Sequence, residues 1–111
     1  MSVKYSVKLT NTAIEQLREV FAYISKILRE PEIARNWSNK IQKDISSLEH
    51  MPFRYPSIDE EPWKAEGIRK MSSRNFIIYY WINDSTSTVW VTAVVYSRRD
   101  QIAILRNMPK E

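Results

Sequence analysis

Residues 63–100, with the sequence WKAEGIRKMSSRNFIIYYWINDSTSTVWVTAVVYSRRD, decide the fold of this 111-residue chain. They contain two long runs of β-branched and aromatic residues, FIIYYWI over residues 76–82 and VWVTAVVY over residues 89–96. A shorter extended run precedes them over residues 66–71. Such runs are typical of β-strands. The separators are rich in Ser, Asn and Asp, which favour tight turns, so we expect two hairpins and an antiparallel meander of three strands.

The residues before this meander predict one more strand and two helices. Residues 4–9 alternate between apolar and polar side chains, which indicates a half-buried strand. Apolar residues then recur every three or four positions over residues 12–29 and again over residues 32–50, as in amphipathic helices. Pro31 separates the two helices and is expected in the first turn of the second. Three polar residues are candidates for the N-cap of the first helix: Thr10, Asn11 and Thr12.

The predicted order of elements is β-α-α-β-β-β in a single α+β domain that spans residues 1–111. We expect the helical hairpin to pack on one face of a four-stranded, mainly antiparallel sheet, because each helix has an apolar stripe to bury. The other face of such a sheet can remain open to solvent. Residues 100–107 are expected to form a short C-terminal helix or an irregular packed tail.

The composition excludes several classes of site. The chain has one glycine and no cysteine, so it lacks a glycine-rich phosphate loop, a disulfide framework and a thiolate metal site. Its one histidine, His50, is interpreted as a partner of the helix dipole or a surface residue. We therefore expect no metal and no cofactor. No apolar run is long enough to span a membrane, and the N-terminal residues lack the apolar block of a signal peptide.

The positive charge is concentrated in the second half of the chain. Residues 1–62 carry 9 Lys and Arg against 9 Asp and Glu, whereas residues 63–111 carry 8 against 4, which accounts for the whole net charge of +4. A one-sided positive field favours an anionic partner, such as nucleic acid or an acidic protein segment. The alternative is an ordinary solvated basic surface.

Basic residues flank the strand runs, and aromatic residues lie within them. Guanidinium groups recognise phosphate through paired donors, and aromatic rings can stack on unpaired bases. Arg69 and Arg98 can meet on one face of the meander if its last strand lies close to its first. Alternatively, the aromatic residues are half-buried strand residues and the arginines are edge charges that discourage aggregation. The candidate functional residues are Arg69, Lys70, Arg74, Tyr96, Arg98 and Arg99.

A family resemblance extends over nearly the whole chain and rests on six segments: YSVKLTNTAIEQL, LREVFAYI, ARNW, LEHMPFRYP, GIRKMSSRNFIIYYWI and VVYSRRDQIAIL. In this order they resemble the RelE/ParE superfamily of toxins from type II toxin–antitoxin modules. The resemblance implies the same β-α-α-β-β-β fold. It also implies a cytoplasmic toxin that inhibits bacterial growth, and a cognate antitoxin that neutralises it in a hetero-oligomer.

The superfamily divides by activity. RelE-like members cleave mRNA on the ribosome without a metal, whereas ParE-like members inhibit DNA gyrase. On the RelE pattern, Arg69 and Arg98 would hold the phosphate and Tyr96 would transfer a proton, which is the chemistry that attack by a 2′-hydroxyl requires. The resemblance leaves Lys70, Arg74 and Arg99 as contacts to nucleic acid or to another target.

Two positions depart from the RelE pattern. Ile77 stands where RelE has an arginine, and Ile104 or Gln101 stands at the position of the C-terminal tyrosine. These departures favour the ParE-like side and gyrase as the target. The alternative is a metal-independent mRNA endonuclease, and a third possibility is an inactive relic that binds antitoxin.

Overall fold

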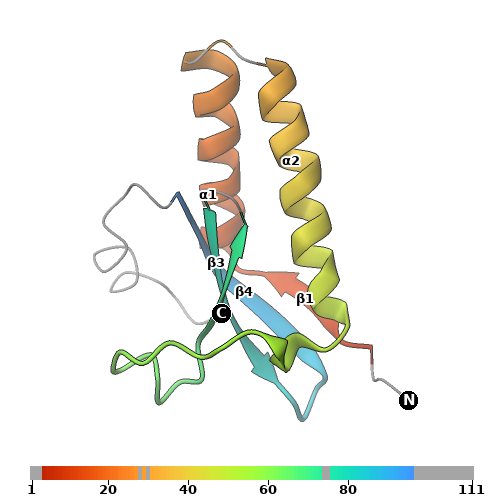
Figure 1. Ribbon diagram of the computed structural model, residues 1–111, viewed down its shortest axis with the longest axis vertical. Coiled ribbons are helices and arrows are strands. Elements are labelled where there is room, and N and C mark those ends of the chain that lie inside the picture. The colour runs from red at the N-terminus through yellow and green to blue at the C-terminus, as the bar shows by residue number, and fades with distance from the viewer. Residues whose placement is uncertain (1–3, 28, 30, 74–75, 97–111) are drawn as a thin grey trace.

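The computed structural model describes residues 4–27, 29, 31–73 and 76–96. The predicted element order is confirmed. Helices and strands follow one another as β1 (Ser6–Leu9), α1 (Asn11–Ala22), α2 (Pro31–Ser46), β2 (Arg69–Ser73), β3 (Phe76–Asn83) and β4 (Thr88–Tyr96). The two helices form a hairpin that stands on the sheet and projects beyond it (Figure 1). The tail predicted over residues 100–107 lies outside the described residues.

The sheet is mixed, with the strand order β1-β4-β3-β2. The meander is antiparallel as predicted, with Met71 opposite Ile78 and Ile77 opposite Val95. The N-terminal strand pairs in parallel with the last one, so that Val7 lies opposite Val89. A parallel pair needs a long crossover, and the helical hairpin together with β2 and β3 supplies it. The last strand is therefore central, between β1 and β3.

Beyond the end of β1, side chains at and near the start of α1 bind the edge of β4 that β1 pairs with, and a bulge in β4 marks this change of partner. Tyr80 pairs with Val91 and Tyr79 pairs with Ala93, so Thr92 is the extra residue between them. Its carbonyl accepts a hydrogen bond from the Thr10 hydroxyl at 3.2 Å. Two residues further along β4, the Val94 amide donates to the side-chain oxygen of Gln16 at 2.8 Å. Side chains at the start of α1 therefore replace the strand partner that the short β1 does not provide.

Individual residues determine where the two helices begin. Thr10 is the N-cap of α1, because its hydroxyl oxygen accepts the Ala13 amide proton at 3.1 Å. The first helix was expected to run to residue 29, but its α-helical part ends at Ala22 and a π-helical turn follows over Tyr23–Ile27. Pro31 begins α2, as predicted.

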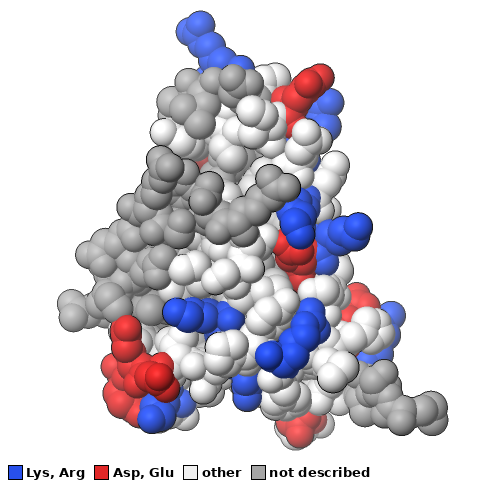
Figure 2. Space-filling model, in the orientation of Figure 1, with Lys and Arg blue, Asp and Glu red and all other residues white. Residues whose placement is uncertain are grey.

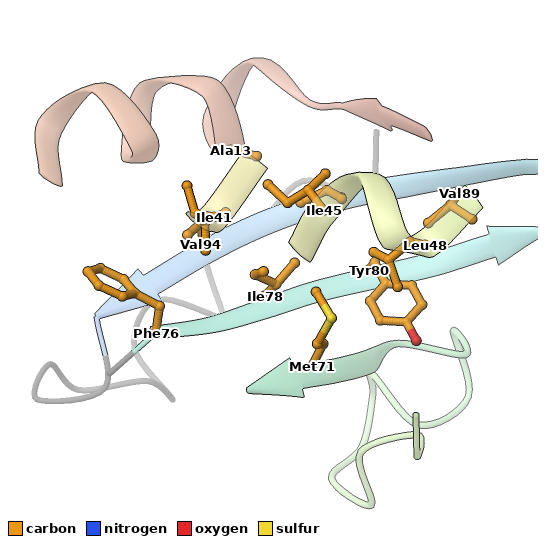
Figure 3. Packing of buried hydrophobic residues seen from close by; sticks show 11 residues of the cluster. Ala13, Ile41, Ile45, Leu48, Met71, Phe76, Ile78, Tyr80, Val89 and Val94 are labelled. Carbon is orange, nitrogen blue, oxygen red and sulfur yellow. The ribbon is translucent and has the colours of Figure 1, made fainter. Parts of the chain in front are cut away.

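The main hydrophobic core lies between the helical hairpin and the sheet. Ile41 and Ile45 of α2 point toward Ile78 of β3 and Val94 of β4 (Figure 3). Leu48, in the 3₁₀ turn Ser47–Glu49 after α2, is fully buried in the same cluster. These positions follow the apolar periodicity of the sequence, so the predicted layer of helices on one sheet face is confirmed.

The loop that includes residues 58–68 covers part of the second sheet face, which could also have remained open to solvent. Ile58, Trp63 and Ile68 from this loop pack against Tyr79, Ala93 and Val95 of the central strands. The loop returns along the outer edge of β2, where the Ile58 amide donates to the Ile68 carbonyl at 3.0 Å. Burying Trp63 against these strands removes apolar area from water, which explains why this face is covered.

The loop also delays the start of β2. The extended run was predicted to begin at residue 66, but turns continue up to Gly67, which has a φ of 75°. A residue with a side chain adopts that conformation only with strain, so the single glycine of the chain stands where the backbone requires it. Within the described ranges, no helix is both long and apolar enough to cross a membrane.

Candidate functional site

The candidate residues that the structure describes lie around β2. Arg69 is its first residue and pairs with Tyr80, whereas Lys70 pairs with Tyr79. Tyr80 belongs to the core under the helices and Tyr79 to the cluster on the other face. Because neighbouring strand residues point to opposite faces, Arg69 lies on the helical face and Lys70, which is exposed, lies on the opposite one.

The guanidinium group of Arg69 holds a loop in place. Its Nη1 donates to the carbonyl of Tyr55 at 2.6 Å and to that of Phe53 at 3.4 Å. The same group lies 5.2 Å from the centre of the Phe53 ring, within the range of a cation–π interaction. Arg69 is half-buried, and the contacts of its Nη1 connect β2 to the loop that follows α2.

A second arginine, which sequence reasoning did not single out, anchors the same loop from its other side. Arg54 donates through Nη1 to the carbonyl of His50, and to those of Ser47 and Met51 at 3.3 Å each. Its Nη2 donates to the Ser47 hydroxyl at 2.8 Å. Basic side chains often bind the last carbonyls of a helix, so a basic residue shortly after the end of the predicted helix was the signal for this contact.

The phenol of Tyr80 lies between the two arginines and the loop. Its hydroxyl donates to the Pro52 carbonyl at 2.6 Å. Burial raises the pKa of Tyr80 to about 12, although the positive charges of Arg69 and Arg54 act in the opposite direction. The phenol is therefore neutral and fixed at ordinary pH, and it cannot serve as a ready proton acceptor.

The loop held by these groups displays two apolar side chains. Met51 and Phe53 are 66% and 50% exposed, while Pro52 between them is buried. Met51 has a φ of 51° and a ψ of 55°, a left-handed conformation that is unfavourable for a residue with a side chain. Phe53 also meets the ring of Tyr5 edge to face, with the ring centres 6.2 Å apart.

The remaining candidates are described only in part. Tyr96 is the last residue of β4 and pairs with Phe76. Arg69 pairs with Tyr80, which is four positions from Phe76 along β3, a span of about 13 Å. The backbones of Arg69 and Tyr96 therefore lie at different places along that strand. Arg74, Arg98 and Arg99 lie outside the described residues, and so does the predicted meeting of Arg98 with Arg69.

On the face that Figure 2 shows, the Lys and Arg side chains form no single continuous patch, because uncharged atoms lie between them. Acidic side chains stand at several places on this face, with the largest group at the lower left. The described part of the chain contains no group of three or more His, Asp or Glu side chains that could hold a metal ion. The described site is a hydrogen-bonded loop with two exposed apolar side chains, the exposed Arg54 and the half-buried Arg69.

Two helices on one face of a four-stranded mixed sheet, in the order β-α-α-β-β-β, form the fold of the RelE/ParE structural class. The model of the family described as "ParE toxin of type II toxin-antitoxin system, parDE" matches residues 7–101. The chain belongs to this family and is the toxin of a type II toxin–antitoxin module. In such a module the toxin is paired with a cognate antitoxin.

Solved structures support the fold. The chromosomal ParDE system of P. aeruginosa superposes with a TM-score of 0.69 at 17% identity, covering 86% of this chain and 98% of that one. The RelBE2 toxin–antitoxin complex of Mycobacterium tuberculosis gives a TM-score of 0.61 at 21% identity, covering 85% and 92%. The isolated E. coli RelE toxin gives a TM-score of 0.53 at 17% identity, covering 93% of this chain and 98% of that one. No match was found among curated proteins.

Proposed function

We propose that this toxin inhibits bacterial growth in the cytoplasm by binding DNA gyrase. The observation that carries the proposal is that Arg69 is hydrogen-bonded within the protein: its Nη1 donates to the carbonyls of Phe53 and Tyr55. Cleavage of RNA requires the acid, the base and the phosphate-binding donors to lie within hydrogen-bond reach of one phosphate. Arg69 and the backbone of Tyr96 lie too far apart along the sheet for that arrangement, which supports a binding function over a catalytic one.

In this proposal the basic residues act on a protein target. Lys70 is exposed on the sheet face opposite the helices, and we assign it a contact role together with Arg74 and Arg99. Arg69 positions the loop. Arg98 and Tyr96 are the residues on which the alternative, a metal-independent mRNA endonuclease, would depend.

The cognate antitoxin binds the toxin in a hetero-oligomer and blocks its action. The helical hairpin supports this part of the proposal because its outer half is incompletely covered. Leu17 and Val20 of α1 are only partly buried, and Phe21 and Tyr23 are 40% and 47% exposed. An acidic antitoxin segment that folds on binding would cover these apolar side chains and balance the net charge of +4.

Induction of the toxin without antitoxin tests the choice of target in cells. DNA synthesis and protein synthesis are measured separately, and the 5′ ends of abundant messages are mapped by primer extension. We expect DNA synthesis to fall first while the messages stay intact, and co-expression of the antitoxin to restore growth. Breaks within codons that disappear with Arg98→Ala would instead establish the endonuclease.

Purified components give the direct test. The toxin is added to DNA gyrase and relaxed plasmid, and negative supercoiling is followed on gels. We expect concentration-dependent inhibition that is reversed by antitoxin. Gyrase that retains full activity at a large excess of folded toxin would contradict the proposal.

A further inference from the structure

The loop after α2 presents a small surface of exposed side chains that lies outside both hydrophobic clusters. We define the loop knob as Met51, Phe53, Arg54 and Arg69. Its two apolar members are exposed on either side of a buried proline, Pro52. Single exposed apolar residues are ordinary, but here two stand together and one of them adopts a left-handed conformation.

The knob is held in one conformation by hydrogen bonds. Arg54 binds carbonyls on the helix side of the loop, Arg69 binds carbonyls on the strand side, and the Tyr80 hydroxyl binds the Pro52 carbonyl in between. A surface that is already ordered loses little conformational entropy when a partner binds. The left-handed Met51 is maintained by this network, and backbone strain of this kind is concentrated at functional sites.

The knob also carries positive charge that is not neutralised locally. The guanidinium groups of Arg54 and Arg69 donate to carbonyl and hydroxyl oxygens, which have no net charge. Among the residues that the structure describes, no carboxylate lies within ion-pair distance of either group. Two cations beside exposed apolar side chains favour a partner that presents carboxylates around an apolar pocket.

The chemistry of the knob fits a protein better than a nucleic acid. Methionine, phenylalanine and arginine are enriched in the buried centres of protein interfaces. The ring of Phe53 already contacts the Arg69 guanidinium and the edge of the Tyr5 ring, so it is poorly placed to stack on a base.

The position of the knob separates it from the apolar end of the helical hairpin. Phe21, Tyr23 and Ile33 are exposed near the turn between α1 and α2. The knob follows the other end of α2, whose 16 residues span about 24 Å. A disordered antitoxin can wrap the long hairpin, whereas a small preformed knob is suited to a folded partner.

We propose that the loop knob docks onto an acidic, apolar-centred segment of the folded target protein and that the antitoxin binds mainly elsewhere. This inference rests on the proposed function, in which that target is DNA gyrase. It assigns the contact to Met51 and Phe53 at the centre, with Arg54 and Arg69 beside them.

A pair of substitutions at one position tests both the location and the charge of the contact. Met51→Glu and Met51→Lys change the same exposed side chain, and Ile33→Glu places the same carboxylate on another exposed apolar residue, at the hairpin end. Thermal melting checks that each protein folds. We expect Met51→Glu to raise the concentration needed to inhibit purified gyrase at least tenfold, because it adds a negative charge facing acidic groups. Met51→Lys should raise that concentration less than Met51→Glu does, and Ile33→Glu should change it less than threefold.

Antitoxin binding, measured by calorimetry on the same proteins, identifies which partner uses the knob. We expect Met51→Glu to bind antitoxin as tightly as the wild type. Equal inhibition by Met51→Glu and the wild type overturns the inference, as does loss of antitoxin binding by Met51→Glu. Binding of a single-stranded RNA oligonucleotide that depends on Met51 would also overturn it. If the wild-type protein leaves gyrase unaffected, the proposed function fails, and the inference fails with it.

Discussion

Arg69 is the residue whose role the structure defines most sharply. Its Nη1 lies 2.6 Å from the Tyr55 carbonyl oxygen, which connects β2 to the loop after α2. Hydrogen bonds that involve a charged group contribute about 1.5–3 kcal/mol each when they are well formed. A residue whose contacts are structural is expected to affect stability before it affects any reaction.

We predict that Arg69→Ala lowers the free energy of unfolding by about 1–2 kcal/mol. Arg69→Lys keeps the charge without the planar donors, so its free energy of unfolding should lie between those of the wild type and Arg69→Ala. Urea denaturation measures both values. Lys70→Ala is the matched control, because the neighbouring side chain is exposed on the other face and should change stability by less than about 0.5 kcal/mol. Equal stabilities of Arg69→Ala and Lys70→Ala would show that the guanidinium has no structural role.

Tyr80 predicts a dependence of stability on alkaline pH. Burial raises its pKa in the folded protein to about 12, from the ordinary tyrosine value of 10.0. The folded state therefore keeps a proton that the unfolded state releases, so the contribution to stability is complete below pH 10 and is lost as the pH rises toward 12. Burial also raises the pKa of Tyr79, which adds to the same trend.

The variant Tyr80→Phe separates this contribution from the others. It removes the hydrogen bond to the Pro52 carbonyl and should cost about 1 kcal/mol at pH 7. Between pH 10 and pH 12, its melting temperature should fall less steeply than that of the wild type. Parallel curves of melting temperature against pH for the two proteins would argue against a raised pKa of Tyr80.

Among the elements, the start of α1 carries two functions at one residue. Thr10 accepts the Ala13 amide proton as the helix cap and donates to the Thr92 carbonyl at the bulge of β4. We predict that Thr10→Ala lowers the free energy of unfolding by about 1–2 kcal/mol. Thr10→Ser keeps the hydroxyl and should retain most of that stability in chemical denaturation. A serine variant as unstable as the alanine variant would show that the methyl group matters more than either hydrogen bond.

The elements were predictable because they depend on local pattern. A period of two indicated the first strand, extended runs rich in β-branched and aromatic residues indicated the strands of the meander, and periods of three to four residues indicated both helices. The composition of the separators indicated the hairpins. The bulge at Thr92 was not predictable, because it depends on how β4 pairs with β3. The π-helical turn after Ala22 was not predictable either, because it continues the same apolar periodicity as the α-helix before it. The parallel pairing of β1 was equally hidden, since alternation identifies a strand but not its neighbour.

The candidate site was predictable only as a set of residue types. Arg69 and Lys70 are adjacent in sequence and both basic, yet the period of the strand sends them to opposite faces. Arg54 was missed because it lies in a proline-rich loop with no periodic pattern. Its role depends on carbonyls at the end of a preceding helix, whose exact position sequence alone does not define.

At the scale of the whole molecule, two hydrophobic clusters share one pair of central strands. β3 and β4 contribute Ile78 and Val94 to the cluster under the helices, and Tyr79 and Val95 to the one under Trp63. Because both clusters rest on the same strands, we expect the protein to unfold in one cooperative transition.

We predict that Trp63→Ala lowers the free energy of unfolding by about 3 kcal/mol, because it removes a large buried side chain from the second cluster. Ile33→Ala, at a position that is 54% exposed, is the control and should cost less than about 1 kcal/mol. Differential scanning calorimetry should show a single transition for both variants. An additional early transition in Trp63→Ala would mean that the loop over the second face is an independent unit.

The central position of β4 also determines when the protein can fold. Ser6 pairs with Thr88, so the 82 residues after Ser6 must be made before the first strand can meet its partner. At about 5–20 residues per second, their synthesis takes roughly 4–16 s. Contacts between residues so distant in sequence also slow the folding reaction itself. A nascent chain that has not reached β4 cannot form the sheet, so toxicity starts only after most of the chain has been translated, and an antitoxin made beforehand has several seconds to meet it.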